Sequence, residues 1–470
     1  MIMMKKYIYI FLATGFLLSC TDLEVENKAA LPQEVVLADI EGFQAVLFAA
    51  YESVNDFGYY GQQMMVMPEI LADNMNLVQL TGRYELEFVN ALNSGFTFWF
   101  NRYTAINECN IVINLVNDEA VVGDQAAKDQ LVAEAKFLRA LFYHDLSRAY
   151  SYEPGQEVGG FSEGVVLRTT PTLGLSDADD RPRATNVQVY EQIELDLLDA
   201  IAALPTATAG STEVARANAN AARLLLARVY LYWGRNADAA TQAQAVVAGD
   251  GSDLVAAADY LASWNDAVNP FYPESLFESD LQVADWNGVD GANNSMHSLL
   301  MNNTGGSQFI ITASAELIAA IDAETGDVRR NLFNVEALGN EFNKWRGAKG
   351  TVPFQENIPI LRLSEGYLIA AEALGPGAGD VYLNALRAAR GLPGGVSATV
   401  NNVLEEKRIE FMAEGHRWFD LKRLGRDFPK PATAGIGATF PYNDFKVLPR
   451  LPQSEIELSE GQLSQNPGYN

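Results

Sequence analysis

Apolar residues recur every three or four positions over long stretches of this chain, which is the spacing of amphipathic helices. The pattern covers residues 125–150 and 186–204, and the second stretch stops at Pro205, where a helix cannot continue. An apolar helical pattern also links Ile106, Cys109 and Ile113. The sequence therefore predicts a mainly α fold.

Two stretches read as helical hairpins. Residues 218–248 form two periodic segments around Gly234, and residues 364–390 form two around the turn Gly375–Gly379. Paired helices with small residues where they cross are typical of tetratricopeptide-like repeats. One hairpin cannot bury its own apolar face, so several must stack. We expect a tetratricopeptide-like helical hairpin scaffold.

Long polar segments separate these hairpins. Residues 151–185, 206–215 and 251–357 are rich in Gly, Asn, Pro and Thr, and loops of such length inside a compact body are usually functional. Alternating apolar residues over 271–283 predict a short strand pair. The predicted scaffold thus carries long irregular loop insertions and a few short strands.

The N-terminus has the features of an export signal. Lys5 and Lys6 precede an apolar run over 7–18, which is shorter than the roughly 20 residues of a membrane span. The run ends in Leu-Leu-Ser-Cys, so we expect a signal peptide over 1–19, an acylated Cys20 and a tether over 20–36. The alternative is an ordinary signal peptide with an incidental cysteine. Acidic residues over 21–26 resemble the surface-export signals of some lipoproteins.

Composition argues against several classes of function. The formal charge of −27 disfavours nucleic acid as a partner. With Cys20 lipidated, Cys109 is left without a disulfide partner, and its apolar surroundings predict a buried core residue. The three histidines lack metal-ligand spacing. The Gly375–Gly379 turn follows a helix and lacks the Lys-Ser/Thr of a phosphate-binding loop. We therefore expect no cofactor, no metal and no catalytic residue.

The segment 404–426 is unusually dense in charged and aromatic residues. Leu404, Phe411 and Trp418 are spaced seven apart, which predicts one shared helical face. Gly415 would let two helices bend or approach closely. The segment could be an active site or a buried packing network, and its helical spacing favours the network.

At this point the residues resemble the SusD/RagB family of nutrient-binding outer-membrane lipoproteins. The resemblance rests on blocks at 135–150, 186–205, 358–375, 382–393, 407–426 and 445–470, the last ending in Asn-Pro-Gly-Tyr-Asn. A departure is 151–170, which is longer and more polar than the usual link. The resemblance implies one domain over 37–470, with parts at about 37–260 and 261–470.

The resemblance also implies a function without chemistry. Such a protein would sit on the outer membrane through its lipid, facing the cell exterior, and would bind oligosaccharides for a SusC-like TonB-dependent transporter. A peptide-binding relative on the same scaffold is the alternative. A helical-repeat enzyme and a purely structural assembly protein also remain open.

Candidate ligand contacts combine flat aromatic faces with planar polar groups, which suits sugars. One cluster contains Arg83, Tyr84, Phe96, Trp99 and Asn101. A second contains Trp286 and Asn287, with Asp290, Asn293 and Asn294 nearby. Asp73 and Asn74 could join the first cluster. Trp99 and Phe100 could instead anchor their helix, and Trp233, Trp264, Trp345 and Trp418 are expected to pack in the core.

Overall fold

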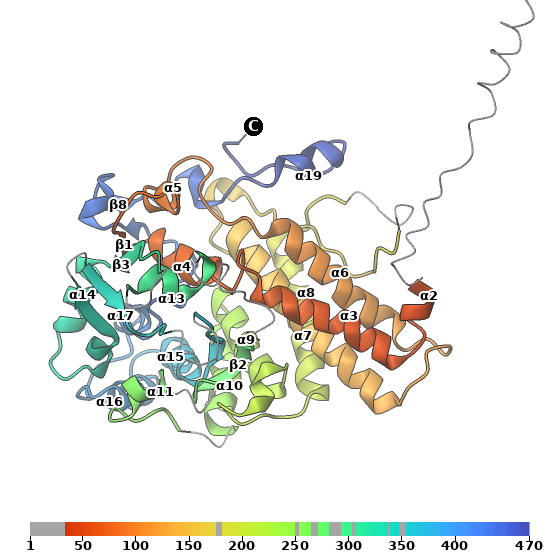
Figure 1. Ribbon diagram of the computed structural model, residues 1–470, viewed down its shortest axis with the longest axis horizontal. Coiled ribbons are helices and arrows are strands. Elements are labelled where there is room, and N and C mark those ends of the chain that lie inside the picture. Colours follow the sequence, from red (N-terminus) through yellow and green to blue (C-terminus); the bar gives the residue numbers. More distant parts are fainter. Residues whose placement is uncertain are drawn as a thin grey trace, which may run out of the picture.

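A computed structural model gives the fold of the chain. It describes residues 33–174, 181–249, 253–264, 271–281, 293–302, 307–336, 339–346 and 354–469. Most of these residues are helical, as expected (Figure 1). The main helices are α3 (Ile40–Glu52), α6 (Trp99–Leu115), α7 (Gln125–Tyr150), α8 (Asn186–Ala203), α9 (Ala219–Tyr232), α10 (Asn236–Gly249), α15 (Leu363–Leu374), α16 (Asp380–Ala389) and α17 (Val400–Glu410).

The main helices pack one on the next in a continuous stack. The order of contact runs from α3 through α6, α7, α8, α9 and α10 to α15 and α16. The step from α10 to α15 is direct, although residues 250–362 lie between them in sequence. The tetratricopeptide-like fold class is therefore confirmed, and separation along the chain does not break the stack.

Local signals explain where these helices begin and end. The Thr185 side chain accepts a hydrogen bond from the backbone N–H of Gln188, and the Gln188 side chain accepts one from the Thr185 backbone N–H. This capping box satisfies two N–H groups that the helix itself cannot. Asn218 caps α9 in a similar way. After α9, Gly234 takes a positive φ of 73°, which turns the chain into α10.

The shorter helices fill the rest of the body. They are α2 (Gln33–Val36), α4 (Gln63–Ile70), α5 (Glu85–Phe88), α11 (Tyr260–Ser263), α13 (Met296–Leu300), α14 (Ala315–Asp322), α18 (Arg417–Lys422) and α19 (Gln453–Leu458). Figure 1 shows α19 at one edge of the molecule, beside the C-terminus and above the helical stack.

The strands correct two expectations about the loops. They are β1 (Met75–Leu77), β2 (Ser275–Ser279), β3 (Ile311–Ala313), β4 (Phe333–Glu336), β5 (Gly339–Phe342), β6 (Ile358–Arg362), β7 (Phe428–Pro429) and β8 (Thr439–Phe440). The predicted strand pair within 271–283 is wrong, because β2 is a single strand that pairs antiparallel with the distant β6. The segment 251–357 is also more regular than predicted, since it supplies three strands of the sheet β1-β3-β5-β4.

The segment 404–426 forms two helices rather than one continuous face. Between α17 and α18, Ala413 and Gly415 take positive φ values of 59° and 78°. Phe411 therefore packs in a small second core with α15 and α16, whereas Trp418 stacks on Phe428 with ring centroids 3.6 Å apart. The expectation of one face for Leu404, Phe411 and Trp418 is wrong, because the turn rotates the second helix.

Gly415 is required at this turn. A Cβ atom there would lie 1.8 Å from the backbone oxygen of Met64, far inside van der Waals contact. The turn thus packs directly on the backbone of α4, and the close approach expected of Gly415 is confirmed.

Other buried residues agree with expectation. Cys109 is fully buried, and burial raises the pKa of its thiol. Trp264, Trp345 and Trp418 are also buried, and Trp264 stacks on Tyr272. Among the described residues, no helix is both long and apolar enough to span a bilayer.

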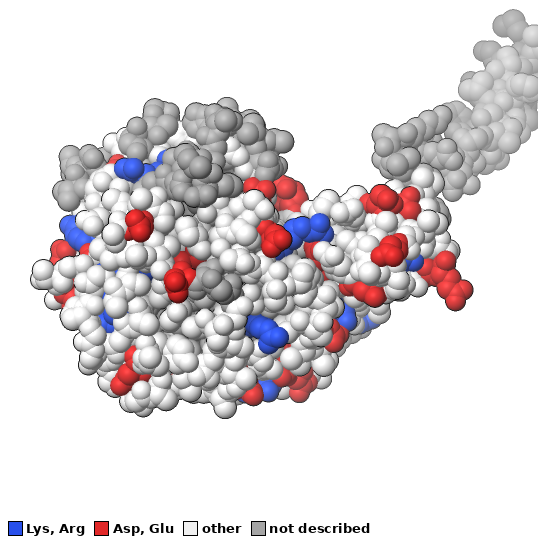
Figure 2. All heavy atoms as spheres, turned by 90° about the horizontal axis from the view of Figure 1, so that it is seen from below, with Lys and Arg blue, Asp and Glu red and all other residues white. Residues whose placement is uncertain are grey.

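The charged residues of one face are dispersed. Figure 2 shows acidic and basic side chains scattered among uncharged ones on this side of the molecule. The described basic residues on this face form no continuous track of the kind that follows a nucleic-acid backbone.

Candidate functional site

Arg83 lies at the surface, at the centre of a group of side-chain amides. Its Nη1 donates to the backbone oxygen of Asn293 at 2.7 Å and to Oε1 of Gln308 at 2.9 Å. Its Nη2 donates to Oε1 of Gln62 at 3.0 Å. Gln79 completes the group, because its amide donates to the Gln308 backbone oxygen at 2.9 Å. We call Phe57, Gln62, Gln79, Arg83, Asn293 and Gln308 the Arg83 patch.

The patch is neutral around its one cation. All three hydrogen-bond acceptors of Arg83 are amide oxygens, and no carboxylate within the described residues forms an ion pair with it. Its Nε and one Nη2 hydrogen make none of these bonds. The guanidinium is therefore held in place while it keeps both its charge and spare donors.

Aromatic rings flank this guanidinium. It lies 5.9 Å from the ring centroid of Phe57 and 6.0 Å from that of Tyr84. Phe57 is 38% exposed, so part of its ring faces solvent. The Tyr84 hydroxyl is buried and donates to Gln62 at 2.6 Å. Burial raises the pKa of Tyr84, which keeps this hydroxyl protonated as a donor.

The backbone is strained on both sides of the patch. Tyr84 takes a φ of 62° and Phe309 a φ of 43°, next in sequence to Arg83 and Gln308. Bulky residues rarely adopt this left-handed conformation, which costs on the order of 1–3 kcal/mol at each position. Such strain concentrates at functional sites. The two strained residues directly follow Arg83 and Gln308, whose side chains hydrogen-bond to each other.

The first turn of α6 brings two more residues to the surface beside the patch. Asn101 donates to Oδ2 of Asp56 at 3.4 Å, and Asp56 precedes Phe57 of the patch. Phe100 is 66% exposed. The helix thus continues the exposed surface away from Arg83.

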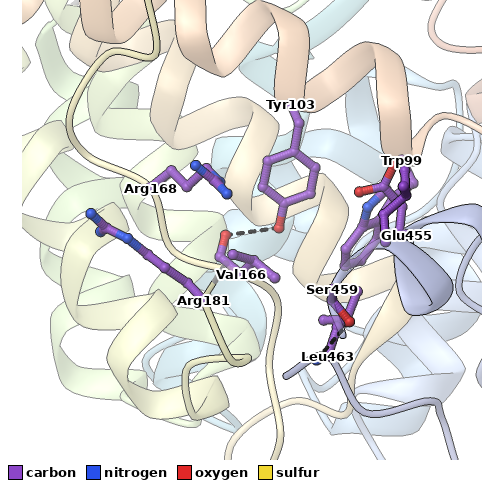
Figure 3. A pocket seen from close by; sticks show the side chains of 9 residues that line it. Trp99, Tyr103, Val166, Arg168, Arg181, Glu455, Ser459 and Leu463 are labelled. Atoms are coloured by element: carbon purple, nitrogen blue, oxygen red, sulfur yellow. Dashed lines mark hydrogen bonds between the residues drawn. The ribbon is translucent and has the colours of Figure 1, made fainter. Parts of the chain in front are cut away.

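A groove follows α6 on the other side of Phe100. Its two adjoining hollows, with volumes of about 330 and 140 Å³, share Trp99, Tyr103, Arg168 and Glu455. Figure 3 shows Arg168 and Arg181 on one side of it and Glu455 with Trp99 on the other, with Tyr103 between them. The Tyr103 hydroxyl donates to the Val166 backbone oxygen at 2.8 Å, which fixes its ring. We call this the α6 groove.

Two aromatic residues predicted as ligand contacts lie in the core. Phe96 stacks on Phe419 with ring centroids 5.3 Å apart and is only 5% exposed. Trp99 packs edge-on against Tyr150 at 5.1 Å and is 1% exposed. This burial favours the alternative in which Trp99 anchors its helix, although its edge still lines the α6 groove.

Asp73 and Asn74 belong to a buried ion-pair cluster. Arg417 Nε lies 2.8 Å from one carboxylate oxygen of Asp73, and Arg408 Nη2 lies 2.9 Å from the other. Asn74 donates to Glu69 and accepts from Arg408 at 2.9 Å. A ligand would have to displace these partners to reach either residue. Their role as ligand contacts stays a prediction.

The two predicted clusters meet at one point. Asn293 and Asn294 were placed with Trp286 and Asn287, and Asn293 contacts Arg83 directly. Trp286, Asn287 and Asp290 lie outside the described residues. The cysteine predicted to carry the lipid, Cys20, also lies outside them.

Sequence reasoning missed several residues of this region, including the buried Gln62 and the more exposed Gln308, Phe57 and Phe100. Glutamines of the patch look like any solvated polar residue in sequence. The sequence did contain a signal for Phe100. Trp99 lies seven residues before the apolar Ile106 and so shares its buried face, whereas Phe100, one position further on, faces outward. No such signal existed for Phe57.

In the described part of the chain, no group of three or more His, Cys, Asp or Glu side chains is arranged to hold a metal ion. The chemistry available at the Arg83 patch is hydrogen bonding, charge and aromatic contact.

Comparison with known proteins agrees with the architecture. The family described as "Starch-binding associating with outer membrane" matches residues 23–231, and the one described as "SusD family" matches residues 301–469. SusD-like protein P2 of Formosa agariphila is 25% identical over 535 aligned residues, covering 99% of this chain and 100% of that protein.

Solved structures give the same result. A SusD superfamily protein from Bacteroides vulgatus superposes with a TM-score of 0.80 and 27% identity, covering 92% of this chain and 99% of that one. A laminarin-binding SusD-like protein has the same fold, with a TM-score of 0.73 and 24% identity over 92% of this chain and 100% of that one. Together with the two family matches, which lie in both halves of the sequence, these likenesses show that the chain belongs to the SusD/RagB family.

Proposed function

We propose that this protein binds oligosaccharides or polysaccharides at the Arg83 patch and delivers them to a SusC-type TonB-dependent transporter. The observation that carries the proposal is the state of Arg83. Its guanidinium is fixed by three neutral oxygens, unpaired with any described carboxylate, and flanked by a part-exposed phenylalanine.

This chemistry suits a sugar. Sugar rings offer apolar faces to aromatic side chains and hydroxyls to planar donors and acceptors. The patch provides Phe57 for the first and the amides of Gln79 and Gln308 with Arg83 for the second. Arginine holds its donors in a rigid planar fork, so it loses little freedom when it binds.

The family supports the same ligand class. One structural relative is described as laminarin-binding, and one matching family as starch-binding. This likeness and the chemistry of the patch both support glycan binding without turnover.

Anchoring is the second part of the proposal. Acylation of Cys20 would hold the protein on the outer membrane, since each buried acyl CH₂ contributes about 0.8 kcal/mol and several chains act together. A Cys20→Ser variant expressed in the native host should leave the membrane fraction. Retention in that fraction would contradict the lipid anchor without touching the binding claim.

The binding claim is tested with the purified protein and a panel containing laminarin, starch, xylan, polygalacturonan and mixed peptides. We expect saturable binding to at least one glycan, none to the peptides, and no released products on long incubation. Trp286→Ala should weaken that binding if residues near Asn293 in sequence face the ligand. Trp99→Ala asks whether Trp99, whose edge lines the α6 groove, contributes to binding. Binding to peptides alone would support the peptide-binding alternative, and product release would show an enzyme.

A further inference from the structure

The α6 groove and the Arg83 patch are connected by a chain of short contacts. The Arg83 guanidinium lies 5.9 Å from the ring centroid of Phe57. The residue before Phe57, Asp56, accepts a hydrogen bond from Asn101, which follows Phe100 in sequence. Phe100 lines the groove together with Arg168 and Glu455. The groove therefore begins at the same turn of α6 that contacts Asp56, the neighbour of Phe57.

The groove repeats the chemistry of the patch with different residues. Phe100, 66% exposed, offers an aromatic face. Arg168 and Arg181 provide guanidinium groups on one wall, and Glu455 provides a carboxylate on the other (Figure 3). Donors and an acceptor on opposite walls, with an aromatic face at the rim, match the hydroxyls and the apolar face of a sugar ring.

The size of the groove fits more than one ring. Its larger hollow, about 330 Å³, falls within the roughly 300–1,000 Å³ of small-molecule sites. The hollow follows α6 from Trp99 to Asn110, which is about 16 Å at a rise of 1.5 Å per residue. This is longer than a single sugar unit.

We infer that the α6 groove is a second binding subsite, which holds a distal unit of the same glycan chain that binds at the Arg83 patch. The inference rests on the proposed function. It adds that the ligand is a chain long enough to cross Asn101, and that affinity rises with chain length until the groove is filled.

The test measures affinity for size series of laminari-, malto- and xylo-oligosaccharides, with an oligogalacturonide series as the acidic probe. For the unaltered protein we expect affinity to rise with length in one of these series. Phe100→Ala should reduce the affinity for long chains by about two- to ten-fold, the range of one aromatic contact, and leave the shortest binding chain unaffected. Arg168→Ala should act in the same direction.

Leu195→Ala is the matched control, because Leu195 is 59% exposed on α8 and lines neither site. It should leave every affinity unchanged, and thermal melts of all three variants should match that of the unaltered protein. Because Phe100 is also exposed, its loss should not impair folding.

The possible outcomes separate the proposed function from the second subsite. If no series binds, the proposed function and this inference both fall. If short chains bind and longer ones bind no tighter, or if Phe100→Ala and Arg168→Ala weaken short and long chains equally, the second subsite is wrong while the proposed function stands.

Discussion

Two regions of this molecule, the buried centre and the Arg83 patch, use arginine in opposite ways. In the centre, Arg329, Arg362 and Arg390 surround Glu410, with contacts between 2.8 and 3.3 Å. Burial alone would raise the pKa of Glu410, but Arg390 and Arg362 outweigh it and hold that pKa well below its ordinary value. At the patch, the hydrogen-bond partners of Arg83 among the described residues are all amide oxygens, and Arg83 remains partly open to solvent.

The two kinds of arginine differ in the charge and the hydrogen-bond donors that remain available to a ligand. A buried guanidinium paired with a carboxylate has its charge cancelled and its donors used, so it holds segments together. A guanidinium held by neutral oxygens is fixed yet still charged, so it can serve a ligand. The segment 404–426, which marks the family most clearly in sequence, is of the first kind, and the ligand chemistry is of the second.

The largest effect is expected from removing the shared acid of the buried centre. Glu410→Ala would leave three buried arginines short of a carboxylate and should lower the free energy of unfolding by about 3–5 kcal/mol. Urea denaturation measures this change in the free energy of unfolding. Glu405→Ala is the matched control, because the Glu405 side chain is 52% exposed, and its loss should cost about 1 kcal/mol or less. Equal effects of the two changes would remove the contrast between the regions.

A pH titration of stability probes a second buried acid. Burial raises the pKa of Glu69 to about 7, against hydrogen bonds from Asn74 and from the backbone N–H groups of Arg417 and His416. The folded state therefore holds a proton that the unfolded chain has released above its ordinary pKa. Stability should fall as pH rises from about 4.5 to 7, by up to about 3 kcal/mol from this group.

Glu69→Gln should remove that part of the fall, whatever it does to stability at a single pH. The comparison is the difference in slope between the two proteins across this pH window. Parallel curves would show that Glu69 does not carry the raised pKa.

At the patch, Arg83→Ala should weaken glycan affinity by about ten- to a hundred-fold, since hydrogen bonds to charged groups contribute about 1.5–3 kcal/mol. Tyr84 would still donate to Gln62, so folding should be largely kept. Arg426→Ala is the matched control, because Arg426 is also held by an amide oxygen, that of Asn401 at 2.8 Å. A comparable loss of affinity in the control would argue against a local role for Arg83.

The smallest effect is expected from the aromatic ring of the patch. Phe57→Ala removes a part-exposed ring and should weaken affinity by about two- to ten-fold. Phe57→Tyr keeps the aromatic face and should restore most of the affinity, as measured by calorimetric titration of both variants with the same glycan. Failure of tyrosine to restore it would mean that the ring does not contact the sugar.

The helical stack could be predicted from sequence because its signal is local. The helices α7, α8, α9, α10, α15 and α16 were expected at nearly their observed bounds, since their apolar spacing repeats over several turns. The helix α4 was not expected, because every residue from Met64 to Ile70 is buried and an all-round buried helix shows no periodicity.

The sheet could not be predicted for a different reason. Its strands are three or four residues long, and Met75 of β1 pairs with Ala313 of β3. Strands so short leave almost no alternating pattern, and no local rule brings partners so far apart in sequence together.

The predicted ligand contacts remain predictions, and the structure divides them between the surface and the core. Arg83, Tyr84, Asn101 and Asn293 were named from their polar and aromatic surroundings, and the structure brings them to one region, with the Tyr84 side chain buried. Trp99 was chosen over its neighbour Phe100, although the phase of α6 buries the first and exposes the second. Gln308 reaches Arg83 only through the tertiary fold.

The most direct test of where the ligand binds needs no substitution. Backbone hydrogen exchange would be compared with and without a saturating glycan from the binding panel. We predict slower exchange in residues 56–63, 79–85 and 307–310, which carry the Arg83 patch, and unchanged exchange in 404–426. Protection of 404–426, with the patch unaffected, would contradict the account and return that segment to its first interpretation as the functional site.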